Sequence, residues 1–142
     1  MKRPSTSDAL LAAARAVRQR AHAPYSNFRV GAAVLDETGR VHAGCNVENA
    51  SYGLTVCAER NAVAAAVAAG ARRVMAVAVA SGSRPPASPC GACRQVLAEL
   101  AAPSAPVFIA GPRGAPTTET TVGALLPLAF ALEPGATSRR RR

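Results

Sequence analysis

The 142-residue sequence contains no tryptophan, only three phenylalanines and two tyrosines, and a single lysine. With so few aromatic rings, alanine and valine must fill most of a core, and the stacking platforms typical of proteins that bind single-stranded nucleic acid are missing. No stretch reaches the ~18 consecutive apolar residues of a membrane-spanning helix. Residues 1–23 also lack the apolar run of a signal peptide. We therefore expect a cytoplasmic protein without a membrane segment.

Acidic residues are scarce as well. Eight aspartates and glutamates stand against seventeen basic residues, which leaves a formal net charge of +9. Such an excess suits a polyanionic partner. However, Arg139–Arg142 form a run at the end of the chain, and most other arginines are scattered among apolar residues. Nucleic acid is therefore not the partner that we expect.

Length and hydrophobic content limit the architecture. With 142 residues, of which 49% are hydrophobic, the chain has the size of about one domain and is too apolar to be disordered from end to end. The pattern predicts a first helix that Ser7 or Asp8 caps and that runs to about Ala21. It predicts further helices over 56–69, 91–101 and 122–126, and strands over 28–35, 40–47, 74–80 and 106–110. This order predicts an α/β fold in which a mixed sheet carries helices on its faces.

Three of the four cysteines stand at the beginnings of two predicted helices. Cys57 is followed by Ala and Glu, and Cys90 and Cys93 belong to a later Pro-Cys-Gly-Ala-Cys sequence. A helix N-terminus offers free N–H groups and a partial positive charge, which favour a thiolate over a thiol. Three thiolates around one Zn²⁺ form a tetrahedral site with one open position, the arrangement that hydrolytic zinc requires.

Glu59 stands two residues after Cys57, where it would point towards such an ion without binding it. A carboxylate in that position can take a proton from a water molecule that the metal has made more acidic, and return it to a substrate. Three thiolates outweigh the charge of the ion. We therefore expect Arg60 and Arg94 to donate hydrogen bonds to the sulfurs.

Each of these residues also has a simpler interpretation. Cys90 and Cys93 alone would be compatible with a redox pair. Glu59 alone would be a solvated acid favoured by the helix dipole, and Arg60 and Arg94 alone would be surface charges. The joint pattern favours the zinc site over these interpretations.

The remaining cysteine and the two histidines carry less information. Cys45 lies in a predicted strand and is expected to be a small buried side chain, while His22 and His42 have no companions that would make them ligands. One alternative from another class stays open: a structural zinc or nucleic-acid-binding module in which Cys45 supplies a fourth ligand.

The combination of Cys-Ala-Glu with Pro-Cys-x-x-Cys is the zinc-deaminase signature. The chain resembles a small bacterial cytidine deaminase of the homotetrameric type. The resemblance rests on APYSNFRVGAA (23–33), GCNVENASYG (44–53), CAER (57–60), PCGACRQ (89–95) and LLPLAF (125–130). It implies a three-layer α/β/α fold with a mixed five-stranded sheet flanked by helices. It also implies one deaminase domain over 1–134, followed by a disordered Arg-rich tail over 135–142.

The family pattern assigns roles to particular residues. One zinc ion per subunit is implied on three cysteines, here Cys57, Cys90 and Cys93, and the acid of Cys-Ala-Glu, here Glu59, is implied as the catalytic proton shuttle. Arg60 follows the subclass that has an arginine beside the thiolates. Substrate contacts are implied for Phe28, Asn46, Val47, Glu48, Ala58 and Phe130.

The Asn46–Glu48 pair also makes chemical sense as a ribose site. A hydroxyl group can donate to a carboxylate and accept from an amide, whereas a carboxylate in the sugar pocket repels the phosphates of nucleotides and polynucleotides. We therefore expect a free nucleoside as substrate.

The activity that the resemblance implies is zinc-dependent hydrolysis of cytidine and 2′-deoxycytidine to uridine and 2′-deoxyuridine, with release of ammonia, in pyrimidine salvage. It further implies a homotetramer with shared active sites, in which Phe130 reaches a neighbouring subunit's site and Ala50 and Tyr52 lie at subunit contacts. Two related activities stay open, on a non-nucleoside aminopyrimidine such as a blasticidin-type antibiotic and on a polynucleotide. The Asn46–Glu48 pair argues against both.

Overall fold

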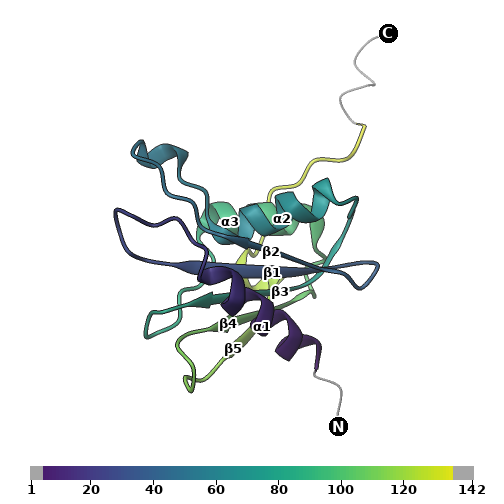
Figure 1. Ribbon diagram of the computed structural model, residues 1–142. Coiled ribbons are helices and arrows are strands. Elements are labelled where there is room, and N and C mark those ends of the chain that lie inside the picture. The colour runs from purple at the N-terminus through teal and green to yellow at the C-terminus, as the bar shows by residue number, and fades with distance from the viewer. Residues whose placement is uncertain (1–4, 136–142) are drawn as a thin grey trace.

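The structure is a computed structural model that describes residues 5–135. Its helices and strands follow one another along the chain as shown in Figure 1. They are α1 (Thr6–Arg18), β1 (Val30–Asp36), β2 (Val41–Cys45), the 3₁₀-helix η1 (Tyr52–Leu54), α2 (Ala58–Ala68), β3 (Val74–Ser81), α3 (Gly91–Leu100), β4 (Pro106–Ala110), β5 (Thr118–Thr121) and α4 (Val122–Leu125).

Within the described residues, five strands form one mixed sheet in the order β2-β1-β3-β4-β5. β1 pairs antiparallel with both β2 and β3, and β4 pairs antiparallel with β5. β3 and β4 are parallel, and α3 is the crossover that joins them. The mixed five-stranded sheet and the α/β class are therefore confirmed.

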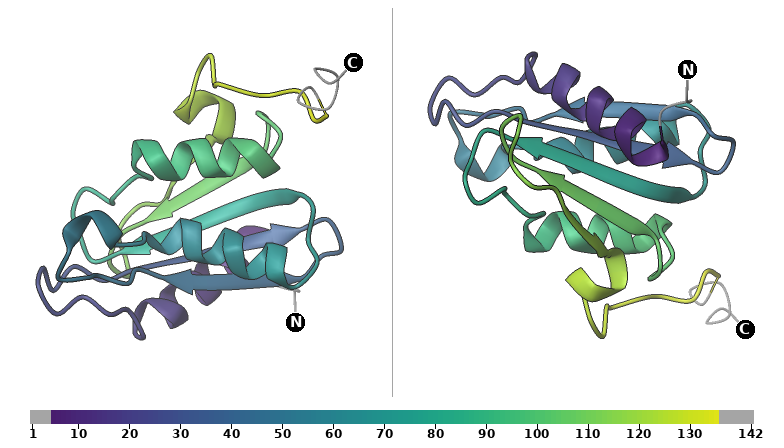
Figure 2. Two further views of the ribbon diagram at one scale, coloured as in Figure 1. Left: turned by 90° about the horizontal axis from the view of Figure 1, so that it is seen from above. Right: turned by 90° about the horizontal axis from the view of Figure 1, so that it is seen from below.

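Helices cover both faces of this sheet. α1 lies on one face, and α2 and α3 lie on the other (Figures 1 and 2). In β3, Val77 and Val79 pack into the core beneath α2 and α3, while Ala78 and Ala80 pack against α1. Because successive residues of a strand point to opposite faces, β3 separates two cores. The result is the predicted three-layer α/β/α architecture.

Two glycines allow the helices to approach the sheet closely. A Cβ atom at Gly31 would lie 2.0 Å from the carbonyl oxygen of Ala14 in α1, and one at Gly44 would lie 2.3 Å from the backbone nitrogen of Ala62 in α2. Any side chain at either position would push its helix away. Gly44 thus allows the short distance between β2 and α2, the helix that begins next to Cys57.

The ends of α1 differ from the prediction. Ser5, not Ser7 or Asp8, is the N-cap, and Asp8 completes a capping box by accepting from the Ser5 backbone. The helix ends at Arg18 instead of Ala21.

The hydrophobic pattern does not predict β5. This short strand, with the sequence Thr-Glu-Thr-Thr, lies at the edge of the sheet and is exposed or half-buried along its length. Because all four residues are polar, the strand lacks the alternation of apolar and polar residues that marks a half-buried strand.

The predicted domain boundary at residue 134 stays a prediction, and Arg139–Arg142 lie outside the described residues. Within residues 5–135, no helix combines the length and the hydrophobicity that crossing a membrane requires.

Candidate metal centre and substrate cavity

Three cysteine sulfurs meet where the N-termini of α2 and α3 lie next to each other. Cys57 is the N-cap of α2, Cys90 is the N-cap of α3, and Cys93 lies in the first turn of α3. The three Sγ atoms lie within 4.8 Å of one another, and those of Cys57 and Cys90 are 3.9 Å apart. A tetrahedral ion with Zn–S bonds of about 2.3 Å holds its sulfurs about 3.8 Å apart. The cluster therefore fits zinc.

Positive charge surrounds this cluster. The partial charges of two helix N-termini oppose the negative charge of three thiolates. Arg60 adds a full positive charge, because its Nη2 lies 3.8 Å from Sγ of Cys57 and donates to the Thr55 carbonyl at 3.1 Å. The bond to Cys57 is the main reason why the pKa of Arg60 is raised, so the guanidinium stays charged.

The prediction for Arg94 needs correction. Its guanidinium donates to the carbonyl groups of Pro89 and Leu125 at 2.7 and 2.8 Å and to the Ser88 hydroxyl at 3.3 Å. These partners belong to the loop before α3 and to α4, so none of these bonds goes to a sulfur. Arg94 thus fixes the segment that leads into Cys90, not the thiolate itself.

Burial affects the thiols unequally. It is the main cause that raises the pKa of Cys93, and the negative charges of Glu59 and Cys57 add to it. Burial also acts to raise the pKa of Cys90, but hydrogen bonds from the backbone N–H groups of Cys93 and Ala92 contribute to a net lowering. A divalent cation would hold all three sulfurs as thiolates and offset this crowding of negative groups. Three thiolates are the soft donors that zinc accepts.

Glu59 lies beside the cluster in the first turn of α2, and only 5% of its surface is exposed. It lines the same cavity as Cys57 and Cys90. Burial raises the pKa of the Glu59 carboxyl, and nearby Cys93 and Arg60 oppose this only in part. A raised pKa brings a carboxyl closer to neutral pH, where it can both accept and donate a proton.

The cavity next to the cluster has a volume of about 270 Å³. This is close to the lower end of the ~300–1,000 Å³ range of small-molecule pockets. The loop before β1, the segments on either side of η1, the start of α2 and the loop before α3 all contribute to its wall. The lining residues are Ser26, Phe28, Val30, Asn46, Glu48, Thr55, Cys57, Glu59, Val79, Ala87, Ser88 and Cys90.

Glu48 presents a fixed negative charge to this cavity. Its carboxylate accepts hydrogen bonds from the Ser26 hydroxyl and from the backbone N–H groups of Tyr25 and Ser26, the latter two at 2.9 and 3.3 Å. The bond from the Ser26 hydroxyl is the main cause that lowers the pKa of Glu48, although burial opposes it. The carboxylate is therefore ionised and held in one orientation.

The side-chain amide of Asn46 forms hydrogen bonds to the backbone at and just before the start of β1. Its Oδ1 accepts from the Val30 N–H and its Nδ2 donates to the Phe28 carbonyl, both at 2.8 Å. An amide oxygen has two lone pairs and an amide nitrogen has two hydrogens, so each atom keeps one position for a ligand. Asn46 thus also orients the backbone that carries Phe28 into the cavity wall.

Other predicted substrate residues lie outside the cavity lining. Val47 is 44% exposed, and its backbone pairs with Val56. Ala58 is fully buried at the start of α2. Phe130 is 71% exposed and borders a separate depression beside α4.

The prediction that Cys45 is buried is also corrected, because its side chain is half-buried at the end of β2. It is not part of the metal-ligating cluster found in the described part of the chain. This argues against a structural zinc site with Cys45 as fourth ligand.

Three polar residues of the cavity had no role in the prediction: Ser26, Thr55 and Ser88. Ser26 stands inside the first of the five matched stretches, two positions before Phe28. The Ser26 hydroxyl could have indicated this role, because a buried carboxylate such as Glu48 requires hydrogen-bond donors.

The fold and the cluster together define a class of protein: a three-layer α/β/α protein that can hold one zinc ion beside a buried carboxylate. Comparison with known proteins agrees. Residues 4–109 match the family model described as the cytidine and deoxycytidylate deaminase zinc-binding region.

Relatives and solved structures extend the match to most of the chain. A cytidine deaminase of Sporosarcina psychrophila is 48% identical over 124 residues, which cover 87% of this chain and 90% of the relative. A crystal structure of cytidine deaminase from Burkholderia pseudomallei has a TM-score of 0.84 and 51% identity, covering 89% of this chain and 100% of the other. The crystal structure of cytidine deaminase from Mycobacterium tuberculosis has a TM-score of 0.77 and 42% identity, covering 91% and 100%. The chain belongs to the cytidine and deoxycytidylate deaminase family.

Proposed function

We propose that this chain catalyses the zinc-dependent hydrolytic deamination of cytidine and 2′-deoxycytidine. The products are uridine or 2′-deoxyuridine and ammonia, and the reaction serves pyrimidine salvage. The observation that carries the proposal is the meeting of the Cys57, Cys90 and Cys93 sulfurs at a cavity that Glu59 also lines. Family membership, and relatives and solved structures that bear the name cytidine deaminase, support this choice of substrate.

In each subunit, Cys57, Cys90 and Cys93 would together hold one zinc ion. When bound, the ion supplies a Lewis acid that makes an attacking water molecule more acidic. The helix N-termini and Arg60 support this role, because they offset the excess negative charge of the three sulfurs.

Glu59 moves the protons. It takes one from the attacking water as the water oxygen bonds to C4 of the cytosine ring, and it delivers that proton to ring N3. C4 is then tetrahedral and carries both a hydroxyl and the amino group. Glu59 next transfers the hydroxyl proton to the amino nitrogen, the C4–N bond breaks, and ammonia leaves a C4 carbonyl behind. The raised pKa of the Glu59 carboxyl suits a group that is protonated and deprotonated in turn.

Glu48 and Asn46 bind the sugar. The ionised Glu48 carboxylate accepts from a ribose hydroxyl, and the free positions of the Asn46 amide complete the contact. The fixed negative charge of Glu48 repels phosphate, which selects a nucleoside over a nucleotide or a polynucleotide. Phe28, which is 40% exposed at the cavity wall, packs against the pyrimidine.

The enzyme assembles as a homotetramer with shared active sites, with Phe130 completing a site on a neighbouring subunit. Exposed apolar side chains gather in two segments that fit this assignment, one at Tyr52 and Leu54 and one at Leu128, Phe130 and Leu132. The predicted location in the cytoplasm stays a prediction.

The test is direct. Purified zinc-loaded protein is incubated with cytidine, and uridine and ammonia are quantified by chromatography and a coupled ammonia assay. We expect equimolar uridine and ammonia, and no turnover of cytidine monophosphate at comparable concentrations. A blasticidin-type antibiotic is added as competitor. Preferred turnover of the antibiotic, or of single-stranded DNA, would replace the nucleoside assignment with one of the two alternatives.

A further inference from the structure

A second cavity lies on the face of the sheet opposite the cysteine cluster. It has a volume of about 380 Å³ and lies between α1 and the segments that follow β3 and β4. Ala80 lines this cavity, whereas its neighbour Val79 lines the cavity beside the cysteines. Because consecutive strand residues face opposite sides, the sheet itself separates the two cavities.

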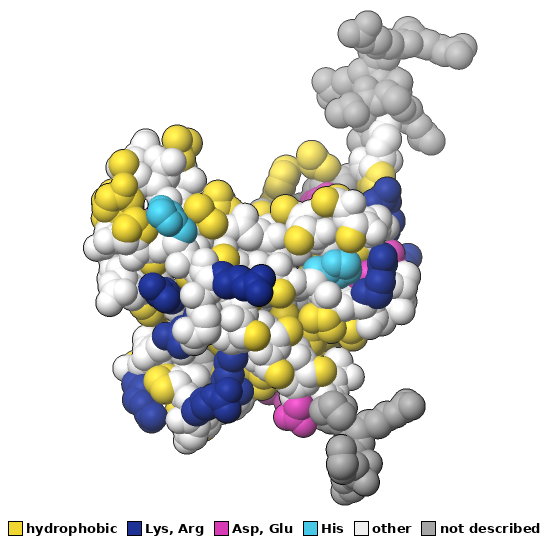
Figure 3. Space-filling view, in the orientation of Figure 1, with side chains coloured by type: hydrophobic (Ala, Val, Ile, Leu, Met, Phe, Trp, Pro, Cys, Tyr) yellow, Lys and Arg dark blue, Asp and Glu magenta, His cyan; other side chains and the backbone are white. Residues whose placement is uncertain are grey.

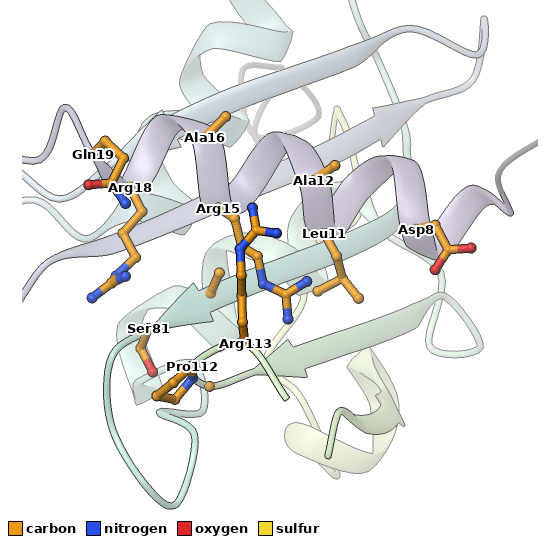
Figure 4. Close-up of a pocket in the computed structure, with 12 residues that line it drawn as sticks. Asp8, Leu11, Ala12, Arg15, Ala16, Arg18, Gln19, Ser81, Pro112 and Arg113 are labelled. Carbon is orange, nitrogen blue, oxygen red and sulfur yellow. The ribbon is translucent and has the colours of Figure 1, made fainter. Parts of the chain in front are cut away.

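Three arginines from different parts of the chain border this cavity. Arg15 and Arg18 come from α1, and Arg113 comes from the turn after β4. Figure 4 shows the side chains of Arg15 and Arg113 extending into the same space, with Ser81 on the opposite wall from α1. We call this cavity, bordered by Arg15, Arg18, Arg113 and Ser81, the arginine pocket.

One of the arginines that line the arginine pocket has a buried donor without a partner. The Nε atom of Arg15 is buried and forms no hydrogen bond. A buried donor that lacks an acceptor costs free energy, and so do like charges that share a partly enclosed space. An anion in the pocket removes the repulsion between these like charges.

Among the residues that the structure describes, no acidic side chain forms an ion pair with these arginines. In residues 5–135 both ion pairs involve Asp36, and neither reaches the arginine pocket. Asp8 also lines the cavity, but its carboxylate accepts from the Ser5 hydroxyl and N–H in the α1 cap. In Figure 4 it lies at the far end of α1 from Arg18.

The remaining contacts leave the guanidinium groups available. The Nε of Arg18 donates to the Arg29 carbonyl at 2.9 Å, which fixes the side chain and leaves its terminal nitrogens for a ligand. Figure 3 shows basic side chains around α1 on the visible face and few acidic ones. The net charge of +9 attracts anions to the whole molecule.

We propose that the arginine pocket binds a phosphate group, either free or carried by a small molecule. Guanidinium groups bind phosphate through paired, charge-assisted hydrogen bonds. The volume of about 380 Å³ falls within the ~300–1,000 Å³ range of small-molecule pockets, which leaves room beside a phosphate for the group that carries it. The arginine pocket is separate from the site proposed for cytidine. It favours a negatively charged ligand, whereas Glu48 repels negative charge from the cytidine site.

The test is calorimetric titration of the zinc-loaded full chain with inorganic phosphate at low ionic strength. We expect one saturable site per chain, with an affinity that falls as salt is added. The Arg15→Gln/Arg113→Gln double variant should bind phosphate at least tenfold more weakly. Arg20→Gln is the matched control, because Arg20 is an exposed arginine just beyond α1 that does not line the pocket.

A second pair of variants keeps the arginines intact. Ala12 is exposed on α1 and lines the pocket, so Ala12→Glu places a carboxylate beside the guanidinium groups and Ala12→Gln adds similar bulk without charge. Ala12→Glu should abolish phosphate binding, while Ala12→Gln should retain more of it. This pair decides the question even where the double variant fails to fold.

Phosphate esters then identify the source. Titrations with ribose 5-phosphate and uridine monophosphate follow the titration with inorganic phosphate. Tighter binding of an ester supports a carried phosphate, and equal or weaker binding supports the free ion. The absence of saturable phosphate binding would overturn the proposal. So would full affinity in both the double variant and Ala12→Glu, since the phosphate would then bind elsewhere, for example at the cysteine cluster.

Discussion

The sulfur atoms of Cys57 and Cys90 lie 3.9 Å apart, although the two cysteines are thirty-three positions apart in the chain. Each cysteine is the N-cap of its helix, and both helices pack on the same face of the sheet. Two rigid elements therefore hold the ligands in position. Such preorganisation makes the metal part of the folded structure, so loss of one ligand affects both metal content and stability.

Cys90→Ala should lower the zinc content from about one ion per chain to a small fraction, and should lower the melting temperature as well. The two remaining sulfurs do not supply the three ligands that the proposed zinc site requires, and the buried Cys93 thiol loses its cation. Elemental analysis and thermal unfolding measure the two effects. Cys45→Ala is the control, because Cys45 lies outside the cluster. Normal zinc content in Cys90→Ala, or zinc loss in Cys45→Ala, would contradict the proposed ligand set.

Glu59→Gln should retain zinc and the fold but lower kcat by about 10²–10⁴-fold or more, because an amide cannot carry the proton between water, N3 and the amino group. Steady-state kinetics with cytidine and elemental analysis measure the two properties together. Glu99→Gln removes an exposed glutamate from α3 and should leave both unchanged. Cytidine turnover near the normal rate in Glu59→Gln would refute the proton-transfer role.

Glu48→Gln should raise KM for cytidine by about 10-fold or more, since a hydrogen bond to a charged group contributes about 1.5–3 kcal/mol. It should also reduce the discrimination against cytidine monophosphate, because the repelling charge is gone. Ser26→Ala provides an intermediate case, since it removes one donor to the Glu48 carboxylate but keeps the charge. Unchanged discrimination in Glu48→Gln would show that other groups exclude the phosphate.

Much of this site was predictable because the chemistry is local in sequence. Cys57 and Glu59 lie within one helical turn, as do Cys90 and Cys93, and Gly70 marks the end of α2 with its positive φ of 98°. Strong local patterns of this kind predict where helices begin and which residues they present.

What the sequence did not reveal depends on tertiary contacts. The prediction that Arg94 donates to the sulfurs was wrong. Residue type and spacing do not show whether a guanidinium group meets a sulfur or the carbonyl groups of Pro89 and Leu125. Likewise, the local pattern does not link His42 to Asp36, six positions earlier, yet the Nε2 of His42 lies 2.7 Å from Oδ2 of Asp36 across the β1–β2 hairpin. Strand register, not local sequence, brings this pair together.

The buried Asp36 carboxylate predicts acid-sensitive stability. Hydrogen bonds from the Thr38 hydroxyl and from His42 are the main causes that lower the pKa of Asp36 below its ordinary value of 3.8. The folded state therefore prefers the ionised form. The resulting stabilisation is present above the ordinary pKa and is lost as the pH falls through the lower pKa of the folded state.

Asp36→Asn should therefore be less stable than the unsubstituted chain at about pH 7, and the difference should shrink below about pH 4. Urea unfolding at a series of pH values measures it. Glu119→Gln, an exposed substitution in β5, should show little difference at any pH. A gap between Asp36→Asn and the unsubstituted chain that widens as the pH falls would contradict the assigned direction of the pKa shift.

Phe130 offers a test of the shared active site. Its side chain is 71% exposed, and only its carbonyl is held, by the Gln95 amide at 3.0 Å. If the ring completes a neighbouring subunit's cavity, Phe130→Ala should lower kcat/KM by about 10-fold or more, because a buried phenylalanine contributes about 1.5–3 kcal/mol. Met75→Ala, which truncates an exposed side chain on β3, should not.

Mixing subunits separates this role from a simple loss of stability. Glu59→Gln subunits keep Phe130, and Phe130→Ala subunits keep Glu59, so a mixed oligomer contains some sites with both residues intact. Co-refolding the two variants should then recover activity that neither has alone, while size-exclusion chromatography with light scattering reports the number of subunits. No recovery from verified mixed oligomers, or full activity of a dilute monomer, would show that each chain supplies its own site.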